Sequence, residues 1–93
     1  MEVDQLVSAL NETISLLRTS RTSGKISMPV DEVIRRLEAE VAKAENAKPI
    51  DVNLLDRFFA PTGVIQEISV ENGWGTRFLR LSEVVDQFTG YAP

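Results

Sequence analysis

Apolar residues recur at steps of three and four along the first part of the chain, and the spacing is that of one side of an α-helix. The repeating side chains are Val3, Leu6, Val7, Leu10, Ile14 and Leu17. Asp4 stands near the start of this segment and Arg18 at its end, which are the charges that a helix dipole favours at those positions. The pattern therefore predicts an amphipathic helix over Val3–Arg18.

A second amphipathic helix is expected after the polar, locally cationic loop Thr19–Lys25. Its predicted apolar stripe is Val30, Val33, Ile34, Leu37 and Val41. Pro29 is expected at the first helical position, where proline is favoured, and Pro49 is expected to end the helix at about Lys48. The pattern places Glu40 on the polar side.

Two shorter patterns lie in the second half of the chain. Asp51 is expected to cap a short third helix that carries Leu54, Leu55, Phe58 and Phe59, ending at Pro61. Farther on, helical steps join Trp74, Phe78, Leu81, Val85 and Phe88, with Gly90 in the place of a C-cap. These patterns predict a third and a last helix.

The segment Thr62–Asn72 allows two interpretations. As a helix it places Ile65, Ile68 and Asn72 on one side, with Thr62 capping its start and Gly73 as a left-handed residue after its end. As a strand it alternates apolar and polar residues imperfectly and would lead through an Asn72-Gly73 turn into a hairpin. We favour the helix, because neither strand face is consistently apolar.

The fold class predicted from these patterns is all-α, a compact bundle of four to five short helices. The alternative is an α+β fold with a C-terminal β-hairpin at about 64–81. At 93 residues the chain is expected to form a single small globular domain over 1–93. The connections look short, so consecutive helices are expected to pack as antiparallel neighbours.

Composition removes many functions from consideration. The chain has no histidine and no cysteine, and therefore lacks the commonest general base and thiolate chemistry. Its 14 acidic and 10 basic residues give a net charge of −4, which argues against binding nucleic acid. No apolar run reaches the roughly 20 residues that span a bilayer. The start of the chain lacks the pattern of a secretory signal, so we expect no membrane association and a cytoplasmic location.

Known motifs for ligands do not fit the sequence. The segment Thr22–Lys25 ends like a phosphate-binding loop, but Ile26 stands where a Ser or Thr is required and the upstream glycine is missing. Asp51, Asn53 and Asp56 offer oxygen ligands without the glycine and the bidentate acid of a calcium loop. We therefore predict no cofactor, no metal site and no catalytic residue.

Four residues are candidates for binding a protein partner. Trp74 lies between two glycines and Arg77 follows it by one helical turn, and aromatic and arginine side chains dominate interface hot spots. A single tryptophan in a small chain is, however, more often part of the core. Glu67 and Glu71 are four residues apart and are interpreted as solvated surface acids, although such a pair could also act as acid and base.

The function predicted from the sequence is that of a non-enzymatic, small acidic protein-interaction module. This class includes inhibitors and immunity-type proteins that neutralise a basic partner. One alternative is a structural protein that self-associates, for example as a homodimer. The other is a small enzyme that uses carboxylates. The acidic excess lies mostly after Pro49, where the sequence has six acidic residues and three arginines. Any surface that binds a partner is expected in that half.

Overall fold

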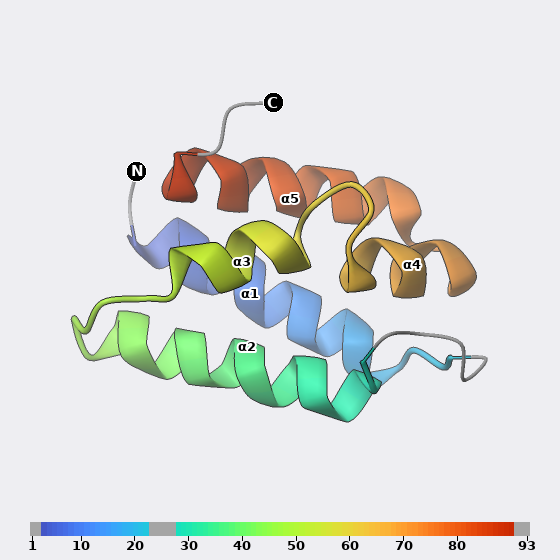
Figure 1. The fold of residues 1–93 in the computed structure, drawn as a ribbon, viewed down its shortest axis with the longest axis horizontal. Coiled ribbons are helices and arrows are strands. Elements are labelled where there is room, and N and C mark those ends of the chain that lie inside the picture. Colours follow the sequence, from blue (N-terminus) through green and yellow to red (C-terminus); the bar gives the residue numbers. More distant parts are fainter. Residues whose placement is uncertain (1–2, 23–27, 91–93) are drawn as a thin grey trace.

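The computed structural model describes residues 3–22 and 28–90 and folds them into five α-helices (Figure 1). They are α1 Val3–Arg18, α2 Val30–Glu45, α3 Val52–Phe58, α4 Val64–Glu71 and α5 Gly75–Thr89. The described residues contain no strand, so the all-α bundle is confirmed and the hairpin at about 64–81 is wrong. The reason lies in α4, which buries Ile65 and Ile68 together, whereas a strand would send them to opposite faces.

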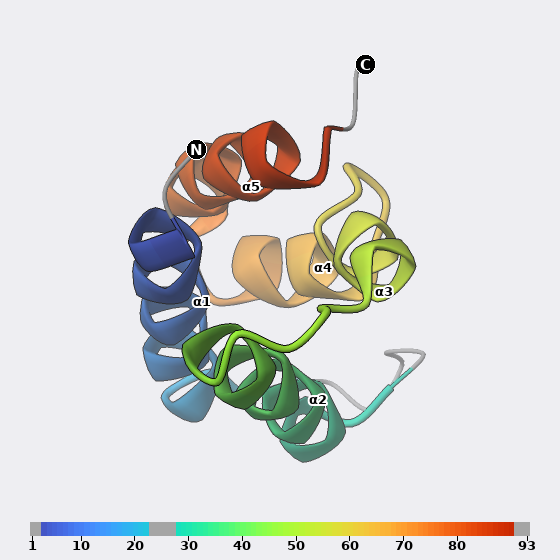
Figure 2. The ribbon, with the colours of Figure 1, turned by 90° about the vertical axis from the view of Figure 1, so that its left-hand side faces the viewer.

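The helices surround one core, and the first and the last of them are neighbours. α1 lies between α2 and α5, while α3 and α4 close the opposite side (Figure 2). α1 packs most extensively against α2 and then against α5, and α5 also packs against α3 and α4. Consecutive helices therefore pair as expected for α1 with α2 and for α4 with α5, whereas α2 with α3 and α3 with α4 are not among the closely packed pairs. The contacts of α5 with α1 and α3 join segments that are distant in sequence.

The predicted apolar stripes meet in the core, except at Val3, which is 43% exposed at the start of α1. Every helix contributes to the core, and its largest fully buried side chains are Phe59, Phe78, Leu6, Leu10, Leu17, Leu37, Leu55, Ile65 and Ile68. The rings of Phe59 and Phe78 lie almost parallel, with centroids 6.2 Å apart. This stack connects the end of α3 to α5 and gives the core its bulkiest contact.

Two helix starts show how well capping could be predicted. Asp51 caps α3 as expected, because its Oδ1 accepts a hydrogen bond from the Leu54 amide at 3.0 Å. The cap expected of Thr62 is wrong, since α4 begins after Gly63. A Cβ at Gly63 would lie 2.5 Å from the Arg57 carbonyl oxygen. Only glycine allows this close approach, and it shifts the start of α4 by one residue.

α2 and α4 each end in a Schellman turn. After α4 the turn places Gly73 at φ 81°, as predicted, and the Trp74 amide donates to the Ser69 carbonyl at 2.8 Å. After α2 it places Ala47 at φ 55°, and the Lys48 amide donates to the Lys43 carbonyl at 2.8 Å. This turn ends α2 at Glu45, earlier than the position near Lys48 predicted from Pro49.

At the other end of α2, Pro29 is the N-cap and not the first helical residue, with φ −60° and ψ 147°. Its carbonyl accepts hydrogen bonds from the Glu32 and Val33 amides at 3.0 and 3.1 Å. The prediction was therefore one residue off. An extended proline fits this place because only its carbonyl is needed there.

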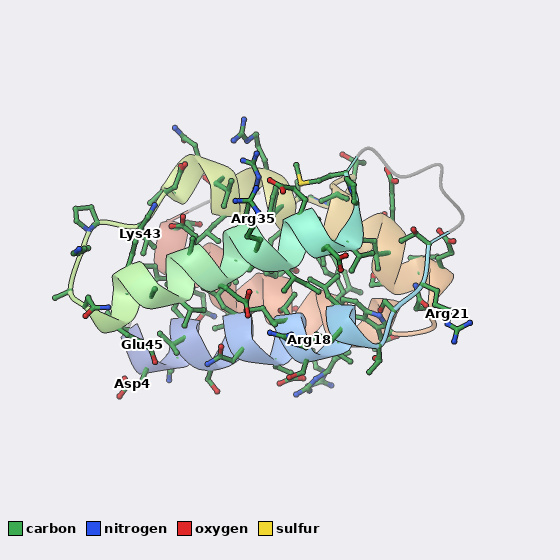
Figure 3. All side chains as sticks on the ribbon, turned by 90° about the horizontal axis from the view of Figure 1, so that it is seen from below. Asp4, Arg18, Arg21, Arg35, Lys43 and Glu45 are labelled. Atoms are coloured by element: carbon green, nitrogen blue, oxygen red, sulfur yellow. The ribbon has the colours of Figure 1, made fainter. Side chains whose placement is uncertain are left out.

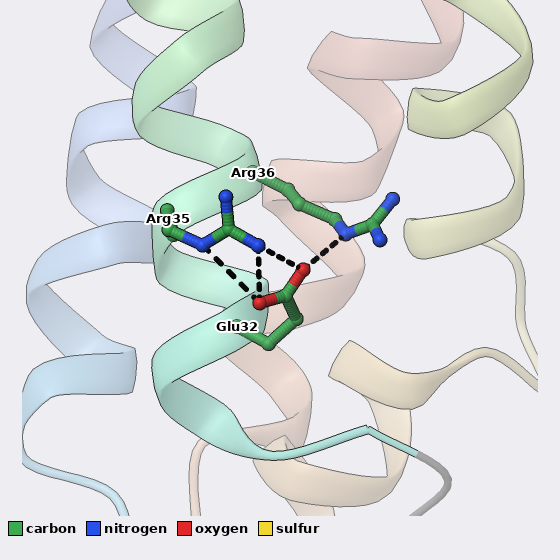
Figure 4. Close-up of polar contacts among 3 residues, drawn as sticks. All are labelled: Glu32, Arg35 and Arg36. Carbon is green, nitrogen blue, oxygen red and sulfur yellow. Dashed lines mark hydrogen bonds and ion pairs between the residues drawn. The ribbon is translucent and has the colours of Figure 1, made fainter.

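The acids of α2 have distinct roles. Glu32 accepts hydrogen bonds from both Arg35 and Arg36, which lower its pKa (Figure 4). Arg18 of α1, labelled in Figure 3, forms an ion pair at 2.6 Å with Glu38 of α2. Glu40, expected on the polar side, is 4% exposed. The predicted polar side of α2 is thus wrong at this one position.

Glu40 is buried because the chain after α2 folds back over it. Its carboxylate accepts the Asp51 amide at 2.7 Å and the Lys43 ammonium at 2.9 Å. A buried carboxylate needs such partners, because the loss of water would otherwise be unfavourable. Glu40 therefore joins α2 to the residue that caps α3.

Candidate functional site

The four residues predicted to bind a partner lie in three different environments. Glu67 and Glu71 are exposed, one turn apart on α4. Trp74 is half-buried at the turn between α4 and α5 and packs against the core. Arg77 is on the side of α5 that faces α1, where its Nε donates to the Glu12 carboxylate. The two acids therefore remain together, and Trp74 and Arg77 belong to other contacts.

Trp74 holds the start of the α1–α2 connection. Its indole N–H donates to the Ser20 hydroxyl at 2.9 Å, and that hydroxyl donates in turn to the Leu16 carbonyl at 2.8 Å. A half-buried indole with its N–H satisfied inside the protein is typical of a core tryptophan. Trp74 therefore acts mainly within the fold, and the acidic side chains are the more exposed candidates.

Asn72 reinforces this attachment from the end of α4. Its amide oxygen accepts the Arg21 amide at 2.8 Å, and its amide nitrogen donates to the Arg21 carbonyl at 2.7 Å and to the Ile68 carbonyl at 2.9 Å. The Arg21 side chain extends away from the helices (Figure 3). Asn72 and Trp74 thus act together as an anchor for residues 20 and 21.

Two exposed aliphatic side chains accompany the acids of α4. Val70 is 61% exposed and Leu79 of α5 is 57% exposed. A Cβ built on Gly75 would lie 3.4 Å from Val70 Cγ2, so Val70 lies against the start of α5. Leu79 follows Gly75 by one helical turn, on the same side of α5. The two side chains therefore belong to one region of the surface.

Further acids continue this region along α5 to α3. Glu83 is exposed one turn beyond Leu79, and Asp86 follows Glu83 at three residues. Asp86 interacts electrostatically with Asp56 of α3. We call this region the acidic face, and its members are Glu67, Val70, Glu71, Leu79, Glu83, Asp86 and Asp56.

The five carboxylates of the acidic face make no ion-pair contact within residues 3–22 and 28–90, the part of the chain that the structure describes. Burial raises the pKa of Asp86, and the charges of Asp56 and Glu83 raise it further. The Oδ1 atom of Asp56 is buried without a hydrogen-bond partner among the described residues. Ionised Asp86 is therefore held next to other negative charges, which disfavours folding at this position.

Asp86→Asn is expected to stabilise the protein at neutral pH, by less than about 1 kcal/mol because the site is largely solvated. A raised folded-state pKa means that Asp86 disfavours folding once ionised. The contribution of Asp86 to the free energy of unfolding is most favourable at pH values below its ordinary pKa of 3.8. This contribution is lost as the pH rises through the folded-state pKa. Urea unfolding of both proteins between acid and neutral pH measures the difference, which should shrink to zero at low pH and decrease with added salt.

Glu45→Gln is the matched control, since it removes one charge from the exposed end of α2. It corrects for the change in net charge, together with the small gain from removing a negative charge at the C-terminal end of a helix. An Asp86→Asn protein that is less stable than the wild type at pH 7 would contradict the assignment of uncompensated charge.

The aliphatic members of the acidic face were missed in the sequence. Leu79 falls outside the seam that Phe78, Leu81 and Val85 form on α5. Val70 likewise lies outside the side of α4 that Ile65 and Ile68 bury. Each of these apolar residues lies on the polar side of its predicted helix, and this could have marked them as exposed from the sequence alone. That Val70 and Leu79 are neighbours depends on how α4 turns into α5.

No protein-family model matches the chain, and neither a curated protein nor a solved structure matches it. In the described ranges, no three acidic side chains are grouped so that they could hold a metal ion. None of the helices in those ranges has the length and apolar character needed to cross a membrane.

Proposed function

We propose that this chain is a non-enzymatic protein-interaction module of the cytoplasm, and that its acidic face binds a basic partner protein. The single observation that carries the proposal is that two exposed aliphatic side chains share a surface with five carboxylates that form no ion pair within residues 3–22 and 28–90. Inhibitors and immunity-type proteins that neutralise a basic partner belong to this class. The partner would carry lysine or arginine side chains around an apolar centre.

The carboxylates support the proposal through electrostatics. Clustered charge of one sign accelerates encounter with a partner of opposite charge and selects against partners of like charge. Glu67 and Glu71 repel each other at one turn's separation, and Asp86 is close to both Asp56 and Glu83. Cations from a partner would relieve these repulsions, so binding and stability are coupled on this surface.

The aliphatic side chains support it through desolvation. Single exposed aliphatic residues are common on proteins and need no explanation. Here Val70 and Leu79 lie together among acids, so one docked apolar group could cover both. Burying apolar surface contributes about 25 cal/mol per Å², which would add affinity to the orientation set by the charges.

The test uses a labelled synthetic peptide of lysine and leucine that forms an amphipathic helix. Fluorescence anisotropy measures its binding to the protein. We expect binding that weakens with salt and that falls at least about tenfold in the Glu67→Gln/Glu71→Gln variant, which is about 1.4 kcal/mol. A Val70→Ser/Leu79→Ser variant should weaken this peptide while leaving the binding of a lysine–glutamine peptide of equal charge unchanged.

The matched control is Asp31→Asn/Glu45→Gln, which removes the same charge from exposed positions on α2. α2 and α5 lie on opposite sides of the bundle (Figure 2). Equal weakening by the control and the Glu67/Glu71 variant would show attraction to net charge only and would overturn the proposal. The proposal would also be overturned if sedimentation showed a monomer–dimer equilibrium that the Val70→Ser/Leu79→Ser variant abolishes. In that case a second copy of the chain would cover the acidic face.

A further inference from the structure

A groove of about 400 Å³ runs between α1 and α5, on the opposite flank of α5 from the acidic face. The buried side chains of Ala9 and Leu81 form its floor, and Val84 contributes apolar surface at its wall. Gln5 and Gln87 line it with amides. The groove thus combines a small apolar floor with hydrogen-bonding groups that could orient a ligand.

Two arginines give this groove a positive charge, opposite in sign to the net charge of the chain. Arg77 and Arg80 line the groove from α5, and Glu12 of α1 is the acidic residue in its lining. Arg77 uses its Nε to donate to Glu12, and no other acceptor for its guanidinium is found among the described residues. Arg80 has no ion pair within those ranges. One surplus positive charge and several free N–H donors therefore face the groove.

Guanidinium groups bind carboxylates well, because their planar fork donates two parallel hydrogen bonds. Arg77 and Arg80 are three residues apart and thus lie on neighbouring positions of one helix side. Their ligand is then expected to be anionic. The amides of Gln5 and Gln87 can both donate and accept, which suits the backbone of a peptide.

The dimensions of the groove select the shape of the ligand. Its lining extends from Gln5 to Glu12 on α1 and from Arg77 to Gln87 on α5. At 1.5 Å per residue these stretches are about 10 and 15 Å long. An extended chain rises about 3.3 Å per residue, so the groove has room for three or four residues of extended peptide.

We propose that the α1–α5 groove binds a short extended segment of a partner protein, in which one acidic side chain lies between small or aliphatic residues. Arg80 and the free N–H groups of Arg77 hold the carboxylate. Val84 and the floor at Ala9 and Leu81 receive the neighbouring apolar side chains. This site is independent of the acidic face, which attracts the opposite charge.

The probe is a labelled five-residue peptide with blocked ends and a central glutamate between alanine and valine residues. Fluorescence anisotropy measures its affinity, and amide chemical shifts of the labelled protein locate it. We expect the shifts to change along Gln5–Glu12 and Arg77–Gln87. Replacing the central glutamate by glutamine, or Arg80 by glutamine, is expected to weaken binding at least about tenfold.

Arg57→Gln is the matched control, since Arg57 is an exposed arginine on α3 outside the groove. Ser8→Phe is a second variant, which places a bulky side chain at an exposed position of the groove wall and should block the peptide. Circular dichroism confirms that each variant is folded. Equal effects of Arg80→Gln and Arg57→Gln, equal affinity for the glutamate and glutamine peptides, or the absence of binding would each overturn the proposal.

Discussion

Replacing Phe78 by alanine is expected to lower the free energy of unfolding by about 3–5 kcal/mol. Phe78 is 1% exposed and stacks on Phe59, so its removal leaves a cavity at the place where α3 meets α5. Small domains are stable by only about 5–15 kcal/mol. The variant should therefore be marginally folded, and chemical denaturation followed by circular dichroism measures the loss.

Two neighbouring substitutions make this prediction specific. Phe78→Leu keeps most of the volume and is expected to cost less than Phe78→Ala. Leu79→Ala changes the next residue, which is 57% exposed, and is expected to alter stability by no more than about 0.5 kcal/mol. If Leu79→Ala destabilised the protein as much as Phe78→Ala, the assignment of the two sides of α5 would be wrong.

Glu40→Ala is expected to destabilise the protein by about 2–3 kcal/mol, a large effect for a carboxylate on a helix. The substitution removes the acceptor of the Asp51 amide and the partner of Lys43. Hydrogen bonds to a charged group contribute about 1.5–3 kcal/mol, and a donor left without an acceptor adds a further penalty. Equilibrium unfolding gives the magnitude, and hydrogen exchange of the Asp51 amide should become faster than in the wild type.

Glu40→Gln separates the two contacts of the carboxylate. Glutamine keeps an oxygen for the Asp51 amide and loses the ion pair with the partly exposed Lys43, so about 1 kcal/mol is expected. Glu38→Ala is the control on the same helix, because its exposed pair with Arg18 contributes at most about 1 kcal/mol. An effect of Glu40→Ala no larger than that of Glu38→Ala would contradict a structural role for the buried acid.

The acidic face and the α1–α5 groove give α5 two flanks of opposite charge. Glu83 and Asp86 lie on the flank toward α3 and α4, whereas Arg77 and Arg80 line the groove toward α1. If both proposals hold, one partner could contact the helix from two sides with segments of opposite charge. Such a partner would be recognised by its charge pattern, which is more selective than net charge alone.

Helices and most of their ends could be predicted from local sequence. The steps of three and four residues specify which side of α1, α2 and α5 is buried, since the helix period is a property of the backbone. Asp51 and Gly73 were predicted in their roles because capping and left-handed turns involve only adjacent residues. The errors at Thr62 and Lys48 are of one to three residues and arise where Gly63 and Ala47 make tighter turns.

The surroundings of the candidate residues depended on contacts between distant segments. Glu40 is buried because the Asp51 amide, 11 residues away, folds back to it. Trp74 meets Ser20 across 54 residues, and Arg77 meets Glu12 across 65. Periodicity indicates which side of a helix is apolar, but it cannot indicate which helices meet. The packing of α5 against both α1 and α3 decided that Trp74 faces inward, that Val70 and Leu79 share a surface with unpaired acids, and that Arg77 and Arg80 line a groove.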